Sequence, residues 1–441
     1  MEMERRVVGR VMKRIVPFLM ICYLFAFLDR VNIGFAALTM NRDLGISATA
    51  FGLAAGVFFL TYFLLEVPSN VALVRFGARR WIARIMITWG VLSAATAFVQ
   101  GADSLYFTRA LLGAAEAGFF PGIIFFLTQW FPSEYRARIV AYFMTALPVS
   151  SLIGSPISAL LLSADGFLGL HGWQILFITE GIPSVILGFV VLWYLTDEPK
   201  QAKWLAAQER DWLISRLESE RNLKKQHESQ SLMQTLLAPK VLALGLANFG
   251  GIAGTYALGF FLPQIVNAFG FSIVQTGFIS AIPYIFGVAG MVWLGRRSDR
   301  RQERKGHAIF ALSLLMCGLI LYAVTSGPAG RLCALSLAAF GAFAYLPIFW
   351  TLPTSFLSGK SAAAAIGLIN SIGSLAGFLG PYLMGYMKDA TGNYEAGLLA
   401  IAGLAAFAIA IILLLPHDKN LEFADSSNLK SGPQAADVAA R

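Results

Sequence analysis

The chain has 441 residues, of which 57% are hydrophobic and 13% are charged, and its mean hydropathy is +0.66. Soluble domains carry about 25% charged residues, so this composition excludes an ordinary soluble protein and favours one that crosses a membrane many times. The net charge of +9 does not indicate nucleic-acid binding, because the basic residues lie in short segments between apolar runs.

Twelve apolar runs are long enough to cross a bilayer as helices. They exceed the length that a strand of a membrane barrel needs, so we predict an all-α membrane protein with twelve transmembrane helices. The runs cover residues 15–38, 50–73, 82–100, 104–130, 137–163, 173–195, 240–266, 274–294, 308–326, 331–357, 362–387 and 396–416.

The positions of Lys and Arg predict the orientation in the membrane. If the N-terminus is cytoplasmic, 29 of the 34 Lys and Arg residues fall in cytoplasmic segments, 3 fall outside and 2 fall within the membrane. Cytoplasmic loops of membrane proteins carry an excess of these residues. We therefore expect both termini to be cytoplasmic.

Six runs, a long polar segment and six more runs suggest an internal duplication. A shift of 225 residues places Gly154-Ser155-Pro156 on Leu379-Gly380-Pro381 and Arg75 on Arg300. Such repeats are typical of transporters built from two pseudo-symmetric six-helix bundles. We expect these bundles at residues 1–195 and 240–416, a cytoplasmic linker with an amphipathic helix at 196–239, and a cytoplasmic tail at 417–441.

Charged residues inside the apolar runs are the main functional signal. Asp29 and Arg30 are adjacent in the first run, and Arg109 and Glu116 lie on one face of the fourth. Each charge at the membrane centre costs roughly 2.5–3.5 kcal/mol, and such residues usually mark a substrate or ion path. All four are expected near mid-depth, where they can meet. A closed network that only orders the helices is the alternative. Their counterparts at the 225-residue shift are uncharged: Gly254, Thr255, Ala334 and Gly341.

The segment Gly295-x-Arg297-Ser298-Asp299-Arg300, followed by a basic pair, resembles the loop motif of the major facilitator superfamily. The resemblance implies a gating loop that contains Asp299 and Arg300, in a tight turn near helix ends. A basic cytoplasmic loop without a gating task is the alternative. The first-half copy has Asn70 and Val74 in place of the glycine and the aspartate, so the gating role is not carried over to Val74.

Asp29-Arg30, together with the segment from Arg109 to Gly122, resembles the anion:cation symporter family within that superfamily. Members of this family carry hexuronates, galactonate, tartrate, phthalate-type acids and, in animals, glutamate or sialic acid. The likeness is densest to bacterial tartrate and metabolite:proton symporters. Three further segments add to it: Leu65-Glu66-Val67-Pro68-Ser69-Asn70, Trp130-Phe131-Pro132 and Glu180-Gly181-Ile182-Pro183.

The resemblance implies a role for each charge. Arg30 would bind the substrate carboxylate, Asp29 and Arg109 would pair, and Glu116 would be the proton site, coupled to Asp29. The chemistry of the residues agrees, because a guanidinium group makes a forked, permanently charged partner for a carboxylate. Carboxyl groups in low-dielectric surroundings also favour their protonated form. Tyr62 matches a substrate-contacting tyrosine of the family, with packing as the alternative.

Several uncharged polar residues of the second half are weaker candidates for lining the site, and each can instead join helices by hydrogen bonds. Glu66 is expected to cap a helix end or join a polar network, and Glu180 can have either a structural or a transport role. The second-half candidates are Tyr256, Gln264, Trp350, Thr351, Asn370 and Ser371.

We therefore expect a monomeric, proton-coupled symporter that imports a small organic anion through a bacterial inner membrane. The acid can be tartrate, a sugar acid or an aromatic carboxylate. An export antiporter on the same scaffold is the first alternative, and a non-transporting membrane sensor is the second. We expect no enzymatic activity, no cofactor, no metal site and no nucleic-acid partner, because the sequence shows neither a metal-ligand cluster nor a nucleophile–base pair.

Overall fold

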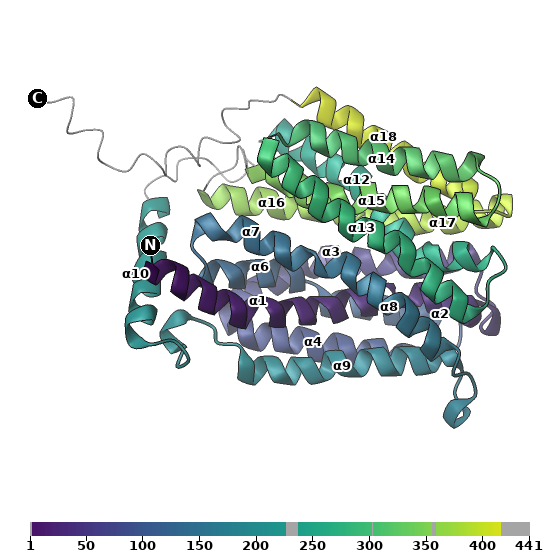
Figure 1. The fold of residues 1–441 in the computed structure, drawn as a ribbon. Helices are drawn as coiled ribbons and strands as arrows, with labels where there is room; N and C mark the ends of the chain where they lie inside the picture. The colour runs from purple at the N-terminus through teal and green to yellow at the C-terminus, as the bar shows by residue number, and fades with distance from the viewer. Residues whose placement is uncertain (1, 226–236, 302, 355–358, 416–441) are drawn as a thin grey trace, which may run out of the picture.

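A computed structural model describes residues 2–225, 237–301, 303–354 and 359–415. Its regular elements in these ranges are helices (Figure 1). Among the described residues, twelve helices or broken helix pairs are long and apolar enough to cross a membrane, and each overlaps one of the twelve predicted runs. The expected tail at 417–441 lies outside the described residues.

We call the first group of helices, α1 to α9, the N-half. Its members are α1 (Glu2–Val31), α2 (Ile33–Asp43), α3 (Ala48–Phe76), α4 (Ala78–Ala95), α5 (Ala102–Glu116), α6 (Phe119–Trp130), α7 (Ser133–Met144), α8 (Ala146–Leu162) and α9 (Gly172–Tyr194). Short 3₁₀ helices occur at η1 (Thr96–Phe98), η2 (Phe167–Gly169) and η3 (Pro199–Gln201).

We call the second group, α12 to α18, the C-half, which lies beside the N-half in Figure 1. Its members are α12 (Pro239–Asn267), α13 (Ile273–Arg301), α14 (Lys305–Val324), α15 (Pro328–Thr354), α16 (Gly359–Ser374), α17 (Ala376–Thr391) and α18 (Glu395–Leu414). Helix α10 (Ala207–Lys225) lies between the two groups in the sequence. The domain boundaries at 195, 239 and 416 stay predictions.

Two of the long helices are interrupted beside the predicted charges. Asn32 separates α1 from α2, two residues after Arg30, and the residues after Glu116 separate α5 from α6. Gly118 has a φ of 84°, which glycine adopts without strain. The carbonyl group of Ala117, at the break, accepts a hydrogen bond from Ser69 Oγ at 2.5 Å. Irregular backbone at membrane depth is typical of places that line a cavity or are buried in protein.

The bundle has two distinguishable ends. We call the end that carries α10 and the N-terminus the α10 end, at the left of Figure 1, and the opposite end the far end. Toward the far end the halves approach closely, because glycines let one backbone touch the other. A Cβ atom added to Gly52 of α3 would lie 2.3 Å from the carbonyl oxygen of Pro381 in α17, and one added to Gly34 would lie 2.7 Å from that of Phe260.

A carboxylate of the C-half also caps a helix of the N-half at the far end. Asp389 of α17 accepts hydrogen bonds from the backbone nitrogen atoms of Ala48 and Thr49 at 3.2 and 2.7 Å, and from the Thr49 hydroxyl at 2.5 Å. The first N–H groups of a helix have no partner within it and favour a negative charge. This cap therefore stabilises contact between the halves at the far end.

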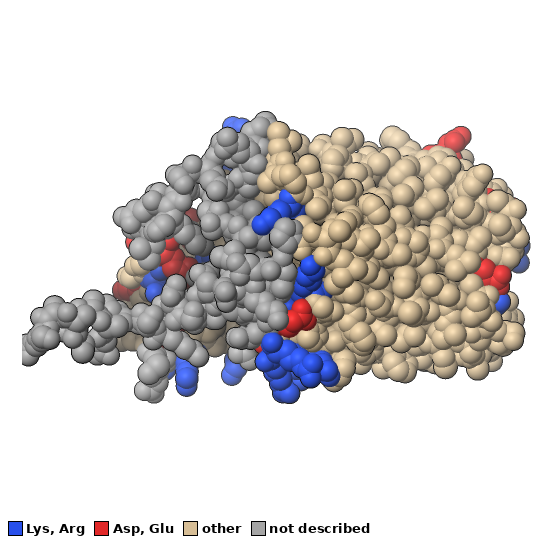
Figure 2. Space-filling model, turned by 90° about the horizontal axis from the view of Figure 1, so that it is seen from above, with Lys and Arg blue, Asp and Glu red and all other residues tan. Residues whose placement is uncertain are grey.

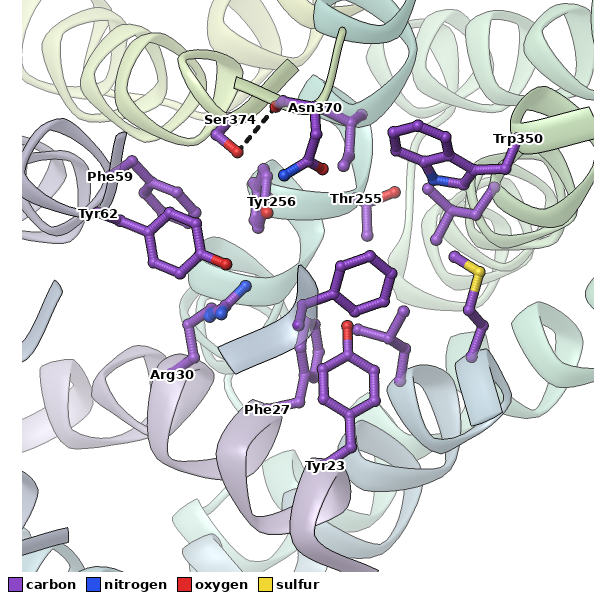
Figure 3. A pocket seen from close by; sticks show the side chains of 15 residues that line it. Tyr23, Phe27, Arg30, Phe59, Tyr62, Thr255, Tyr256, Trp350, Asn370 and Ser374 are labelled. Atoms are coloured by element: carbon purple, nitrogen blue, oxygen red, sulfur yellow. Dashed lines mark hydrogen bonds between the residues drawn. The ribbon is translucent and has the colours of Figure 1, made fainter. Parts of the chain in front are cut away.

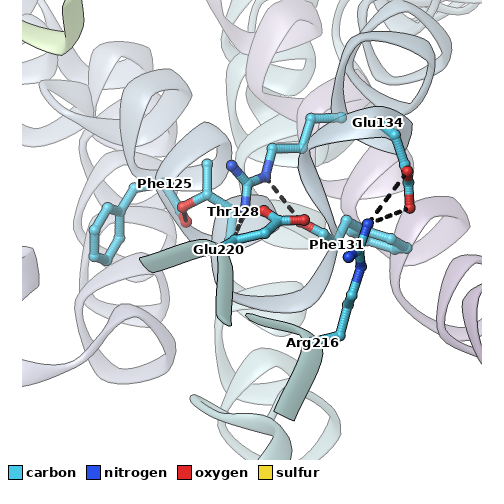
Figure 4. A network of polar contacts seen from close by, with 7 residues as sticks. Phe125, Thr128, Phe131, Glu134, Arg216 and Glu220 are labelled. Carbon is cyan, nitrogen blue, oxygen red and sulfur yellow. Dashed lines mark hydrogen bonds and ion pairs between the residues drawn. The ribbon is translucent and has the colours of Figure 1, made fainter. Parts of the chain in front are cut away.

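Helix α10 lies in the segment for which the sequence predicts an amphipathic helix. Its Arg216 contacts Glu134 of α7 at 3.4 Å, and its Glu220 contacts Arg136 of α7 at 3.5 Å (Figure 4). The ring of Trp204, just before α10, stacks on that of Trp130 with a centroid distance of 5.4 Å. These contacts hold α10 against the N-half.

Charge is distributed unevenly over the surface. In the view of Figure 2 a broad region without charged side chains covers the middle of the bundle, while Lys and Arg gather toward the α10 end and a few charges lie at the far end. An apolar belt between two polar ends is what a lipid bilayer requires. Which end is cytoplasmic stays a prediction.

Candidate functional site

A cavity of about 60 Å³ lies between the two halves, room for a few water molecules (Figure 3). Seven helices and the start of α8 contribute residues to it, and Arg30 is the charged residue among them. Its lining residues with polar atoms are Tyr23, Arg30, Tyr62, Thr255, Tyr256, Trp350, Asn370 and Ser374.

Arg30 is held by one carboxylate and several aromatic rings. Its guanidinium group forms an ion pair with Glu116 of α5, and both side chains are buried. The guanidinium carbon lies 5.3 Å from the ring centroid of Phe58 and 5.6 Å from that of Tyr62. The Nε atom of Arg30 has no hydrogen-bond partner. The residue predicted to bind substrate and the residue predicted to bind the proton are therefore in direct contact.

Asp29 lies in different surroundings from Arg30, although the two are adjacent in sequence. It does not line the cavity. Its carboxylate accepts hydrogen bonds from Trp89 Nε1 at 2.8 Å, Ser93 Oγ at 3.1 Å and Ser184 Oγ at 2.5 Å. Successive helical residues point about 100° apart, because a turn holds 3.6 residues. The rotation directs Asp29 toward α4 and α9 and Arg30 toward the cavity.

The expected ion pair between Asp29 and Arg109 is not formed in this structure. Arg109 is buried, its guanidinium carbon lies 5.0 Å from the ring centroid of Phe58, and its Nε and Nη2 atoms have no hydrogen-bond partner. Asp29 is instead satisfied by neutral donors, and Glu116 pairs with Arg30. The four charges are thus brought into one region, as predicted, but the ion pair that forms joins Arg30 to Glu116.

The predicted second-half residues divide into two groups. Tyr256, Trp350 and Asn370 line the cavity together with Tyr62 and Arg30. Gln264 and Ser371 do not. Gln264 donates to the carbonyl of Phe260 in its own helix at 3.3 Å, which is a local contact. Thr351 likewise donates to the carbonyl of Ile348, at 2.7 Å. Direct contact of any of these residues with a substrate stays a prediction.

Glu66 joins the two halves on the α10 side of Tyr62. Its carboxylate accepts hydrogen bonds from Asn370 Nδ2 at 2.7 Å and from Ser371 Oγ at 3.2 Å, both on α16. The expectation that Glu66 takes part in a polar network is confirmed, but the partners in the other half were not foreseen.

Three polar lining residues were not singled out from the sequence: Tyr23, Thr255 and Ser374. The internal repeat carried a signal for one of them, because Thr255 lies 225 residues after Arg30. Phe27 and Ile252 are related by the same shift, and both also line the cavity. Repeat-related positions of α1 and α12 therefore face the same space, with charge on one side and an uncharged hydroxyl on the other.

The segment with the loop motif is helical up to Arg301, so the expected tight turn at Gly295–Arg300 is wrong. Asp299 forms an ion pair with Arg304, and Ser298 donates to the carbonyl of Glu303 at 2.6 Å. These contacts stay within the C-half. The gating role of Asp299 and Arg300 remains a prediction.

The lining of the cavity combines a positive charge with neutral hydrogen-bond donors. Arg30 offers a guanidinium group, and the hydroxyl groups of Tyr62, Tyr256 and Thr255 and the amide of Asn370 lie around the same space (Figure 3). This set suits a carboxylate that also carries hydroxyl groups. Within the described ranges no group of three or more His, Cys, Asp or Glu side chains is placed to hold a metal ion.

Comparison with known proteins agrees with this architecture. The model of the Major Facilitator Superfamily matches residues 19–381. A protein of Agrobacterium vitis named "Putative tartrate transporter" is 51% identical over 94% of this chain and 95% of its own length. A "Quinolone resistance transporter" of Acinetobacter baumannii is 41% identical over 94% of this chain and 96% of its own length.

The solved structure of the xylose transporter XylE from E. coli superposes with a TM-score of 0.75, at 13% identity, over 93% of this chain and 99% of that one. At that identity the likeness shows the fold alone. The family match over most of the sequence and the high identity to transporters of similar length lead to one conclusion: this chain is a membrane transporter that belongs to the Major Facilitator Superfamily.

Proposed function

We propose that this transporter is a proton-coupled symporter that imports a small organic anion by alternating access. The anion is a carboxylate such as tartrate, a sugar acid or an aromatic acid. The observation that carries the proposal is the contact of Arg30 with Glu116 at a cavity between the halves. The name of the Agrobacterium vitis relative favours tartrate as the first acid to test.

The contact between Arg30 and Glu116 supplies a direct means of coupling proton binding to anion binding. While Glu116 is ionised, its carboxylate occupies the guanidinium group of Arg30 and competes with the carboxylate of a substrate. Protonation of Glu116 removes that competitor and leaves Arg30 to bind the substrate. Loss of the proton restores the competitor and expels the anion. A carboxyl group in surroundings of low dielectric constant binds protons more readily than in water, which suits this exchange.

The proposed orientation places the α10 end in the cytoplasm, as the distribution of Lys and Arg predicts. The far end, with its glycine contacts and the Asp389 cap, is then the closed outer side. Opening outward requires those contacts to separate while the Glu66 contacts at the other side of the cavity hold the halves together. The transported anion would thus cross between the halves.

The test is uptake of L-tartrate into proteoliposomes under an inwardly directed proton gradient. We expect Glu116→Gln to abolish accumulation driven by the gradient and to preserve exchange of labelled for unlabelled tartrate. Glu395→Gln is the matched control, because Glu395 is ion-paired with Arg331 away from the cavity. Gradient-driven accumulation by Glu116→Gln at the level of the unchanged protein would remove Glu116 from the mechanism.

Export by antiport is a second candidate, and the name of the Acinetobacter baumannii relative favours it. The same vesicles distinguish the two. A symporter accumulates tartrate inside the vesicles when the proton gradient points inward. An antiporter that exports quinolones instead expels a preloaded fluoroquinolone from the vesicles in exchange for the protons that enter. Drug efflux without tartrate uptake would replace the proposed function by the second candidate.

A further inference from the structure

A second polar cluster lies within the N-half, next to the cavity but not part of its lining. It contains the carboxyl groups of Asp29 in α1 and Glu180 in α9 and the amide of Asn32, which occupies the break between α1 and α2. Their residues are 2%, 3% and 1% exposed. The proposed mechanism uses Asp29 but assigns no role to Glu180 or Asn32.

Asp29 has hydrogen-bond partners in this cluster, whereas Glu180 and Asn32 each have polar atoms without one. Asp29 accepts its three hydrogen bonds from neutral donors. Glu180 accepts one at its Oε1 atom from Ser158 Oγ at 2.7 Å, while its Oε2 atom has no partner. Neither polar atom of the Asn32 side chain makes a hydrogen bond of normal geometry, although this side chain lies within reach of the Glu180 carboxyl group. An unpartnered amide and an unpartnered carboxyl oxygen therefore face the same buried place.

No positive side chain forms an ion pair with either carboxyl group of the cluster in the part of the chain that the structure describes. Arg30 pairs with Glu116, and Arg109 lies by the Phe58 ring. Two carboxyl groups that interact in one buried site do not both ionise readily, because both charges would be uncompensated. The pair therefore favours holding at least one proton.

Other titratable groups along α9 lie near its two ends. His171, directly before α9, is 3.7 Å from Asp43, and Arg79 is 3.7 Å from Asp197, which follows α9. Helix α8, which supplies Ser158, carries no titratable side chain. Asp29 is thus the charged residue that interacts with Glu180 in the middle of the helix.

We propose that Glu180 Oε2 carries a proton and donates a hydrogen bond to Asn32 Oδ1. Asp29, Asn32 and Glu180 then form a proton-binding site separate from Glu116. Asn32 lies two residues after Arg30, at the helix break, so the proton at this site stabilises the backbone that positions the substrate-binding arginine. The part that this proton takes in transport rests on the proposed symport. A hard metal ion fits less well, because it takes about six oxygen ligands, whereas the described side chains of this cluster offer two unpartnered oxygens, Asn32 Oδ1 and Glu180 Oε2.

The direct test is infrared difference spectroscopy of the purified full chain in lipid near neutral pH, read at the C=O stretching band of protonated carboxyl groups. We expect Glu180→Gln to lose the intensity of one carboxyl group. Asn32→Val removes the acceptor of the hydrogen bond that Glu180 donates. The band should therefore remain but move to higher frequency. Glu395→Gln is the control and should change nothing, because Glu395 is paired with Arg331. An unchanged band in Glu180→Gln, or an unshifted band in Asn32→Val, would overturn the inference.

Gel filtration shows whether Glu180→Gln or Asn32→Val fails to fold. In that case Ser158→Ala replaces the failed variant in the infrared measurement. Loss of the Ser158 donor leaves the proton on Glu180 and moves the same band, whereas a band that does not move contradicts the assignment. Stabilisation by sodium ions that disappears in Glu180→Gln, with no protonated carboxyl band in the unchanged protein, would show a metal site instead of a proton site.

Transport supplies the readout for coupling. In proteoliposomes with an imposed pH difference, Glu180→Gln should accumulate L-tartrate to a limit about tenfold lower for each unit of pH difference, the factor that one coupled proton contributes. An unchanged limit would overturn the coupling role of the site. If Glu180→Gln loses the band while the unchanged protein accumulates no tartrate, the proton site stands and the proposed function fails.

Discussion

The guanidinium group of Arg30 and the carboxylate of Glu116 form a buried ion pair between α1 and α5. Arg30 also lines the cavity, whereas Glu116 lies behind it and does not. A buried ion pair contributes little net stability, because desolvation offsets the attraction between the charges. In the proposed mechanism, a substrate carboxylate replaces Glu116 at Arg30 without leaving the guanidinium group unpaired.

Arg30→Lys is expected to weaken tartrate binding about 10- to 100-fold, because a lysine offers a point charge in place of a two-pronged donor, and hydrogen bonds to charged groups contribute about 1.5–3 kcal/mol. The measurement is the tartrate concentration needed for half-maximal exchange in proteoliposomes. Arg331→Lys is the matched control, since Arg331 also pairs with a glutamate and lies 4.8 Å from the ring centroid of Tyr322. Equal effects of the two variants would contradict a specific role for Arg30.

Ser371→Ala removes one of the hydrogen bonds by which Glu66 joins the halves. A typical hydrogen bond contributes about 1 kcal/mol, so we expect a roughly fivefold larger population that is open at the α10 end. The measurement is the maleimide labelling rate of a cysteine introduced at Ser374, in a chain without its native cysteines.

Ser336→Ala is the control for this measurement, because Ser336 bonds to Leu332 within its own helix. A labelling rate that does not respond to Ser371→Ala would show that the Glu66 contacts do not hold the halves together.

Thr49→Val should favour opening at the far end. It removes the hydroxyl donor to Asp389 while leaving the two backbone donors. Loss of one hydrogen bond costs about 1 kcal/mol, so labelling of a cysteine at buried Phe51, which packs on Phe261 across the halves, should accelerate about fivefold. Thr391→Val serves for comparison, since its hydroxyl bonds only within the C-half. Equal labelling rates in the two variants would rule out the Asp389 cap as a far-end contact.

The short connection before α14 has a pH-dependent cap. Burial opposes ionisation of Glu303, but hydrogen bonds from the backbone N–H groups of Gly306 and His307 and from the His307 ring outweigh it and lower the pKa of Glu303. A carboxyl group with a lowered pKa in the folded state adds stability above its unfolded pKa, and this stability is lost as the pH falls through the folded pKa.

Glu303→Gln should therefore lower the thermal unfolding temperature near pH 7, with a difference that shrinks below about pH 4. Lys305 is close in sequence but bonds to the carbonyl groups of Leu413 and Leu415, so Lys305→Met should not reproduce this dependence on pH. A pH-independent difference for Glu303→Gln would contradict the electrostatic origin of the cap.

The sequence determined the membrane class, the twelve spans and the buried charges of this transporter. Each depends on the local composition of one segment: a run of about twenty apolar residues must span as a helix, and Asp29, Arg30 or Glu116 within it must avoid lipid. Tyr62, Tyr256, Trp350 and Asn370 were also found at the cavity, because polar groups in apolar helices face protein.

Only the tertiary structure decided which groups meet. Neighbouring Asp29 and Arg30 diverge through the rotation of one helix, and their partners come from α4, α5 and α9, far away in sequence. The contact of Glu66 with α16 and the cap of Asp389 on α3 depend on how two halves pack. Hydropathy does not encode that packing, because helix rotation and the approach of the halves arise from side-chain and glycine contacts summed over the whole bundle.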